Sequence, residues 1–209
     1  MKTIHITLLV FILLVPSLLF AQDSFDVKED EYKAAKKIAL DDFEQGHYKK
    51  AIYGFSKLIK EKRDDYELIG KRGIAFLWNG QPQMALNDLN TAIAKAPKAI
   101  YFFYRAGLLA YDDTKGKIAD YDKAIALDAG NARYFYERAT LKLRVFREYV
   151  YSKSLDERLR LYELEKKLGF SLSICQDFNK ASRLDKKYTH KSTVHCEAFT
   201  ELKYYHVHQ

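Results

Sequence analysis

Two cysteines, Cys175 and Cys196, are the residues of this 209-residue chain best suited to covalent chemistry. We expect both in the last helix pair, where a turn near Lys187 would bring them face to face. A disulfide that closes a loop of about 20 residues would add on the order of 3 kcal/mol of stability by constraining the unfolded chain. Two buried free thiols are the alternative, and both states stay open. No base or glycine-rich turn accompanies either cysteine, so a catalytic nucleophile is not expected.

Histidines gather in the C-terminal tail, where metal binding is the chemistry to consider. The tail holds His190, His195, His206 and His208. The last two are two residues apart, and on a helix this spacing points the rings to different sides. No Cys-x-x-Cys or His-Glu-x-x-His pattern joins the histidines, so no metal site is predicted.

Carboxylates are plentiful, but their positions do not suggest a catalytic pair. We expect turns and solvent-facing helix positions for Asp112, Asp113, Asp120 and Asp122. The chain has no glycine-rich loop that would cradle phosphates and no catalytic motif. The sequence therefore predicts a protein that is not an enzyme and that uses no cofactor or metal.

A spacing of 34 residues organises the elements around these side chains. Residues 69–97 read IGKRGIAFLWNGQPQMALNDLNTAIAKAP, with a small residue, Gly73, where two helices would cross, and Gly80 at the turn between them. Small or apolar residues also stand 34 residues before Gly73, Gly80, Ala85, Leu89 and Ala92, at Ala39, Gly46, Ala51, Phe55 and Leu58. Gly107 lies 34 residues after Gly73 and would mark the next crossing.

This pattern resembles the tetratricopeptide repeat (TPR), a family of stacked antiparallel helix pairs, and in particular the exported bacterial members of that family. The resemblance implies an all-α, right-handed solenoid. Its repeats would span residues 32–65, 66–99, 100–131 and 132–185, the third being two residues short. Residues 190–205 would form a capping helix with a polar outer side, as the end of such an array requires.

The fourth repeat is longer than the family pattern. Its second helix follows that of the third repeat by 57 residues instead of 34, an excess of 23, which we place at about residues 144–167. Either the first helix of this repeat is lengthened, or it breaks near Ser152 and a further helix follows. The capping-box pattern of Ser154 and Glu157 favours the break. The role of this insertion stays open.

Residues 1–21 have the layout of a secretory signal peptide. Lys2 precedes an apolar run from Ile4 to Phe20, and the small residue Ala21 stands before a polar segment. An uncleaved anchor is the alternative, but a run of roughly 17 residues is at the lower limit for crossing a bilayer. We expect cleavage after Ala21 and export to the periplasm, to the outer membrane or to the medium, without a membrane span in the mature chain.

The formal charge of +7 bears on the partner. Nucleic acid is not expected as a partner of an exported protein, so the positive charge favours acidic proteins, anionic glycans or lipid surfaces. The alternative is that the charge only keeps a helical array soluble.

In the TPR family the first helix of each pair lines a concave groove, and the resemblance places cationic and aromatic residues there. The predicted partner groove comprises Lys33, Lys36, Lys37, Lys71, Trp78, Tyr101, Tyr104, Arg105, Arg133 and Tyr136, accompanied by Phe43 and Tyr111. Such a surface suits an extended or helical protein segment with acidic or aromatic side chains. We expect some of the aromatic residues to pack between repeats instead.

The co-chaperones of this family that clamp an acidic C-terminal peptide use two asparagines, and this chain has Leu40 and Lys71 at those positions. Their function is therefore not carried over. We predict a non-catalytic scaffold or adaptor of the cell envelope that binds another protein. A structural or polysaccharide-associated component is the alternative, and an enzyme built on the insertion and the tail would require a bound metal. The oligomeric state stays open.

Overall fold

The computed structural model of the chain describes residues 28–151, 170–190, 193 and 196. Every regular element in these ranges is helical, so the predicted all-α fold class is confirmed for them. None of the helices described is long and apolar enough to cross a membrane. The signal peptide predicted at residues 1–21 lies outside the described residues.

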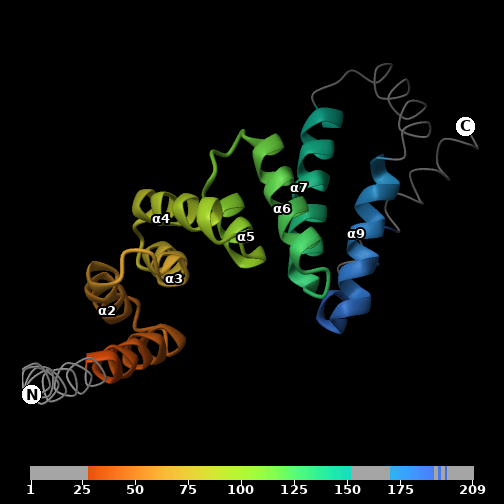
Figure 1. Cartoon of the computed structure of the whole chain (residues 1–209). Helices are drawn as coiled ribbons and strands as arrows, with labels where there is room; N and C mark the ends of the chain where they lie inside the picture. The colour runs from red at the N-terminus through yellow and green to blue at the C-terminus, as the bar shows by residue number, and fades with distance from the viewer. Residues whose placement is uncertain (1–27, 152–169, 191–192, 194–195, 197–209) are drawn as a thin grey trace, which may run out of the picture. The chain divides into compact units, whose positions relative to one another are not determined.

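Contacts within the chain divide it into two compact units, residues 1–88 and 89–209. The first unit contains helix 28–44, α2 (Tyr48–Glu61), α3 (Tyr66–Trp78) and the first half of α4 (Pro82–Lys95) (Figure 1). Glycine makes two of its turns, because Gly46 and Gly80 have φ angles of +78° and +75°, which residues with a side chain rarely adopt. Pro82 begins α4, where its missing N–H costs nothing.

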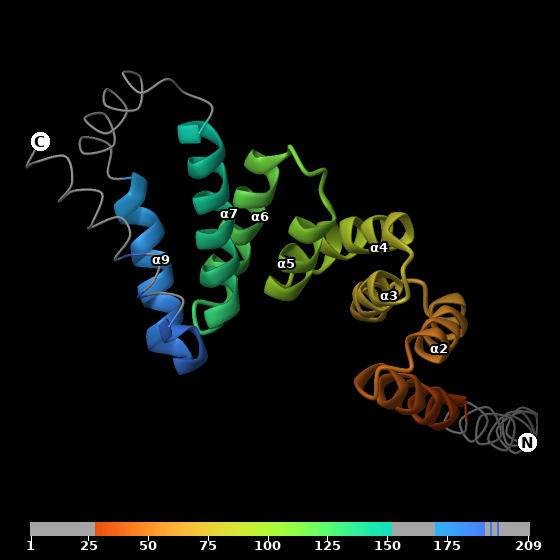
Figure 2. The same ribbon diagram turned by 180° about the vertical axis from the view of Figure 1, so that it is seen from behind.

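The second unit contains the rest of α4 and, among the described residues, four further α-helices and a short 3-10 helix. They are α5 (Ala99–Leu108), α6 (Thr114–Leu127), α7 (Ala132–Tyr151), α9 (Phe170–Leu184) and η1 (Lys186–Tyr188). Both views show α6, α7 and α9 side by side, each running opposite to the one before it (Figures 1 and 2). Most of the predicted insertion and most of the predicted capping helix lie outside the described residues.

Each unit has its own apolar core. In the first unit, Phe55, Leu58 and Leu68 are buried between helix 28–44, α2 and α3. In the second unit, Phe103 packs where α5, α6 and α7 meet, and Phe178 of α9 packs on α7. Burying a side chain of this size stabilises the fold by about 1.5–3 kcal/mol, so these contacts hold the pairs together.

A small buried residue marks the crossing of the two helices in each pair. These residues are Ala39, Gly73, Ala106 and Ala139. The prediction of Gly107 for the third crossing is wrong, because Gly107 is exposed and nothing lies within 4 Å of a Cβ built on it. The spacing from Gly73 to Ala106 is 33 residues, so the third pair has already lost one residue before its crossing.

Candidate partner-binding site

Three lysines of the predicted groove lie on helix 28–44. Lys33 and Lys37 are exposed and one helical turn apart, and the ammonium of Lys33 is 3.4 Å from the carboxylate of Asp30. Lys36 is half-buried and donates to the Asp65 carboxylate at 2.7 Å. Lys33 and Lys37 therefore present their charge to solvent, whereas the charge of Lys36 is neutralised within the unit.

Asp65 joins α3 to helix 28–44. Its carboxylate accepts hydrogen bonds from the backbone N–H of Leu68, from the Lys36 ammonium and from the Tyr32 hydroxyl. Burial acts to raise the pKa of the Asp65 carboxyl, but the bonds from Lys36 and Leu68 outweigh it, and the pKa lies below its ordinary value. Burial, aided by the negative charge of Asp65, raises the pKa of Tyr32 to about 12. Lys36 is therefore a structural residue of this joint.

Aromatic rings from three helices of the first unit meet beside Lys71. Tyr48 of α2 lies between Phe43 and Trp78, with ring centroids 6.1 Å and 6.3 Å away. The Lys71 ammonium is 5.6 Å from the centre of the Phe43 ring, within cation–π range. Trp78 is 50% exposed. We call Phe43, Tyr48, Lys71 and Trp78 the Trp78 cluster; it brings together two predicted groove residues on α3.

Among the predicted groove residues of the second unit, Tyr104 and Tyr136 are half-buried and Arg133 is exposed. The Arg133 guanidinium lies 4.9 Å from the centre of the Phe103 ring, and the Tyr104 ring is 5.3 Å from the same ring. Tyr136 stacks on Tyr188 at 4.6 Å. The prediction for Tyr101 is wrong, because its side chain is 2% exposed and belongs to the core.

Three arginines pair with aspartates between the two helices of the second, third and fourth pairs. We call them the arginine clamps: Arg72–Asp88, Arg105–Asp120 and Arg138–Asp177. In each clamp, Nε and Nη2 of the arginine donate to the two oxygens of one carboxylate; for Arg105 these distances are 2.9 Å and 2.6 Å. Such paired bonds fix the orientation of both side chains.

The remaining nitrogen of each arginine reaches the helix pair before it. Nη1 of Arg72 donates to Ser56 at 3.3 Å, and Nη1 of Arg105 donates to Asn90 at 3.0 Å. Nη1 of Arg138 donates to Asp122 in the same way. Each clamp therefore ties its own pair together and also fastens it to the second helix of the preceding pair.

The clamps correct two predictions. Arg105 was expected to face a partner, but Asp120 holds it, and this hydrogen bond raises the pKa of the guanidinium above its ordinary value. Asp120 was expected on a solvent face, but it is 4% exposed. The sequence carries the signal that would have identified the clamps, because Arg72, Arg105 and Arg138 are each 33 residues apart.

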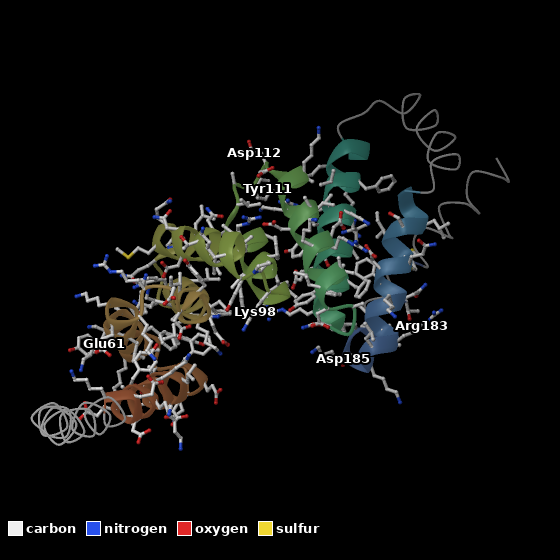
Figure 3. The ribbon with its side chains drawn as sticks, viewed as in Figure 1. Glu61, Lys98, Tyr111, Asp112, Arg183 and Asp185 are labelled. Carbon is white, nitrogen blue, oxygen red and sulfur yellow. The ribbon has the colours of Figure 1, made fainter. Side chains whose placement is uncertain are left out.

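Tyr111 lies in the connection between α5 and α6 (Figure 3). Its ring is exposed and lies 4.1 Å from the Arg144 guanidinium, and its hydroxyl donates to Glu148 at 2.8 Å. Both partners belong to α7. Tyr111 therefore fastens this connection to α7 within the second unit.

The two cysteines meet on the α9 side of the second unit. Cys196 packs on a cluster that includes Ile174 and Phe178, and both cysteines are half-buried and not joined by a disulfide. Burial, together with a hydrogen bond to Cys196, raises the pKa of the Cys175 thiol to about 12. A thiol with such a pKa is a poor nucleophile at neutral pH. In the described part of the chain, no three histidine, cysteine or acidic side chains are grouped to hold a metal ion.

No protein-family model matches this sequence. The curated proteins that resemble it include DnaJ homolog subfamily C member 3 of Mus musculus, 29% identical over 111 residues, and that of Bos taurus, 28% identical over 111 residues. The alignments cover 52% of this chain but 22% of those relatives, so the chain spans about a fifth of their length.

Solved structures share the fold at low sequence identity. MamA 41-end from Desulfovibrio magneticus RS-1 has a TM-score of 0.54 at 18% identity, over 75% of this chain and 76% of that one. The first TPR of Spaghetti (RPAP3), bound to the HSP90 peptide SRMEEVD, has a TM-score of 0.50 at 20% identity, over 55% of this chain and 92% of that one. The described helices therefore form the antiparallel pairs of a TPR-type solenoid fold.

Proposed function

We propose that the chain is a non-catalytic scaffold that binds a segment of another protein along the first helices of its pairs. The Trp78 cluster carries this proposal, because it combines a half-exposed indole, stacked on Tyr48, with the Lys71 ammonium, which lies over the Phe43 ring. Tryptophan and tyrosine are among the residues that most often anchor protein partners. Lys33 and Lys37 extend the positive surface along helix 28–44.

The partner segment is acidic and contains an aromatic or aliphatic side chain. Carboxylates are attracted by Lys33, Lys37 and Lys71, and an apolar side chain would bury part of the Trp78 ring. The structurally similar TPR of RPAP3 holds a peptide, SRMEEVD, that also carries carboxylates. The two asparagines of the peptide-clamping co-chaperones are missing here, so the segment need not end in a free carboxylate.

The test compares variants of the purified chain in affinity purification from the native envelope fraction. Lys37→Glu combined with Lys71→Glu reverses exposed or half-exposed charges, and Trp78→Ala removes the indole. The matched control is Lys57→Glu with Lys60→Glu, two exposed lysines on α2 away from the cluster. Lys36 and Arg105 are left unchanged because their reversal would place like charges beside Asp65 and Asp120.

An envelope protein that co-purifies with the wild-type chain and the control, but not with the two test variants, supports the proposal. Equal recovery with all variants would place the binding surface elsewhere. Recovery of a glycan without a protein would favour the polysaccharide-associated alternative.

The place of action is the cell envelope or the medium, after removal of residues 1–21. This part of the proposal rests on the sequence pattern that ends at Ala21. Sequencing the N-terminus of the protein from its native source tests it: the mature chain should begin at Gln22. A chain that still begins at Met1 in the cytosolic fraction would contradict export.

A further inference from the structure

The first helix pair lacks an arginine clamp. Ile38 immediately precedes the crossing residue Ala39, as Arg72 precedes Gly73, and Gly54 lies 34 residues before Asp88. The two helices approach closely there, because a Cβ built on Gly54 would lie 2.7 Å from the Cβ of Ala39. An aspartate at Gly54 would not fit at this distance. The two helices of this pair are therefore joined by close contact between their backbones at Ala39 and Gly54, whereas an arginine–aspartate ion pair joins the helices of the other three pairs.

An apolar groove lies over this crossing. It encloses about 910 Å³, and its walls include Ala35 and Ile38 of helix 28–44 and Tyr53 and Gly54 of α2. Ile38 is 64% exposed and Tyr53 is 77% exposed. We call this hollow the end groove. Large apolar side chains gathered at one surface with such exposure are typical of a site that binds another molecule.

In the later pairs, the surface that corresponds to the end groove is covered by a helix of the preceding pair. Arg72 occupies in its pair the position of Ile38, and it reaches Ser56 on α2, the second helix of the preceding pair. Arg105 reaches Asn90 on α4 in the same manner. The surface beside each clamp therefore receives a helix. At the end groove such a helix would meet Ile38 instead of arginine, so its facing side must be apolar.

Charged side chains at the rim of the end groove indicate which residues should flank the apolar side of the bound helix. Lys49 and Lys50 of α2 line the end groove, are exposed, and have no ion pair with any residue that the structure describes. Asp42, the one carboxylate in the lining, is 3.3 Å from His47. We propose that the end groove binds an amphipathic helix of a partner protein, with apolar side chains on Ile38 and Tyr53 and carboxylates toward Lys49 and Lys50.

The probe for this site is a synthetic, fluorescein-labelled helix of about 16 residues, long enough for four turns. Leucines at three- and four-residue spacing form its apolar side, and glutamates flank them; a second version carries lysines in place of the glutamates. Binding to the purified full-length chain is measured by fluorescence anisotropy. The glutamate helix should bind saturably and at least tenfold more tightly than the lysine helix.

Variants locate the binding. Ile38→Asp should weaken the glutamate helix by tenfold or more, and Lys49→Glu with Lys50→Glu should reverse the preference between the two helices. Lys71→Ala and the pair Lys57→Glu with Lys60→Glu should leave both affinities unchanged, because none of these lysines lines the end groove; the Lys71 variant thereby separates this site from the proposed partner groove. Circular dichroism of each variant verifies that its helix content is retained.

A photo-crosslinking residue in place of Tyr53 identifies the occupant. A crosslink to the glutamate helix supports the proposal. Crosslinks to residues 1–27 of the same chain, or to a second copy of it, would overturn the proposal in favour of those occupants. Equal affinity for both helices, or no saturable binding, would also overturn it.

Discussion

Replacing Arg105 by methionine should destabilise the second unit more than the equivalent change at Arg138. Arg105 is the only described cation that holds Asp120, whose side chain is 5% exposed. Removing one partner of a buried ion pair costs about 3–5 kcal/mol, because the other charge is left without compensation. Since the Arg105 side chain is partly exposed, water can reach some of the vacated space, and we expect the low end, about 3 kcal/mol.

Arg138 provides the matched comparison. Its partner Asp177 also accepts a hydrogen bond from the ammonium of Lys142, at 3.0 Å. Arg138→Met therefore leaves Asp177 with a second cation, and the loss should be about half as large, near 1.5 kcal/mol. Asp122, the other partner of Arg138, is exposed and can return to water at little cost.

Thermal unfolding followed by circular dichroism measures both losses. For a chain of this size, 1 kcal/mol corresponds to about 2–4 °C in Tm, so Arg105→Met should lower Tm by about 6–12 °C and Arg138→Met by about half of that. Adding Asp120→Leu to Arg105→Met should restore most of the loss, because the stranded charge is removed. A loss below about 2 °C for Arg105→Met, or an equal loss for both variants, would refute the role assigned to the clamps.

Three further results are expected. Tyr111→Phe removes the exposed hydrogen bond to Glu148 but keeps the ring, so the free energy of unfolding should fall by less than about 1 kcal/mol; a larger loss in urea denaturation would contradict the exposed character of this contact. Oxidation by a disulfide donor should join Cys175 to Cys196 within one chain, lowering the mass by two hydrogens, and peptide mapping that finds only free thiols or intermolecular bridges would contradict the adjacency of the two thiols. Burial raises the pKa of Tyr121 to about 12. The stability that the neutral Tyr121 side chain contributes should therefore be fully present below pH 10 and be lost between about pH 10 and 12. A Tyr121→Phe variant with the same alkaline unfolding profile as the wild type would show that this tyrosine does not contribute.

Periodicity predicted the helix pairs because the buried residues that create it are repeated along the chain. Phe55 and Leu58 are in the core, and Gly80 has the positive φ that its turn requires. The register of the third pair was not predicted, because Ala106 and Gly107 are both small and the sequence does not show which one faces the crossing. The structure decides it through burial, since only Ala106 is buried.

Cationic side chains were harder to assign, since residue type does not show whether a charge has an internal partner. Lys71 and Arg72 are neighbours on α3 but point about 100° apart around the helix axis. Lys71 lies near the Phe43 ring, whereas Arg72 turns inward to Asp88. A carboxylate 16 residues later on the facing helix distinguishes the two, and this relation becomes visible only when the repeats are aligned by their burial.

The same reasoning explains why the two proposed binding surfaces differ in character. In a clamp the arginine and the aspartate neutralise each other's charge, and the arginine also bonds to the neighbouring helix pair. The surface beside a clamp is therefore covered by that pair and does not offer a charged site to another protein. Where the clamp is missing, at Ile38 and Gly54, the surface keeps its apolar side chains and the nearby Lys49 and Lys50 keep their charge. Helix 28–44 keeps positive charge at its surface for a different reason, since Lys33 and Lys37 are exposed and neither pairs with a described carboxylate on a facing helix. Reversal of the lysines at one surface should therefore leave binding at the other surface unchanged.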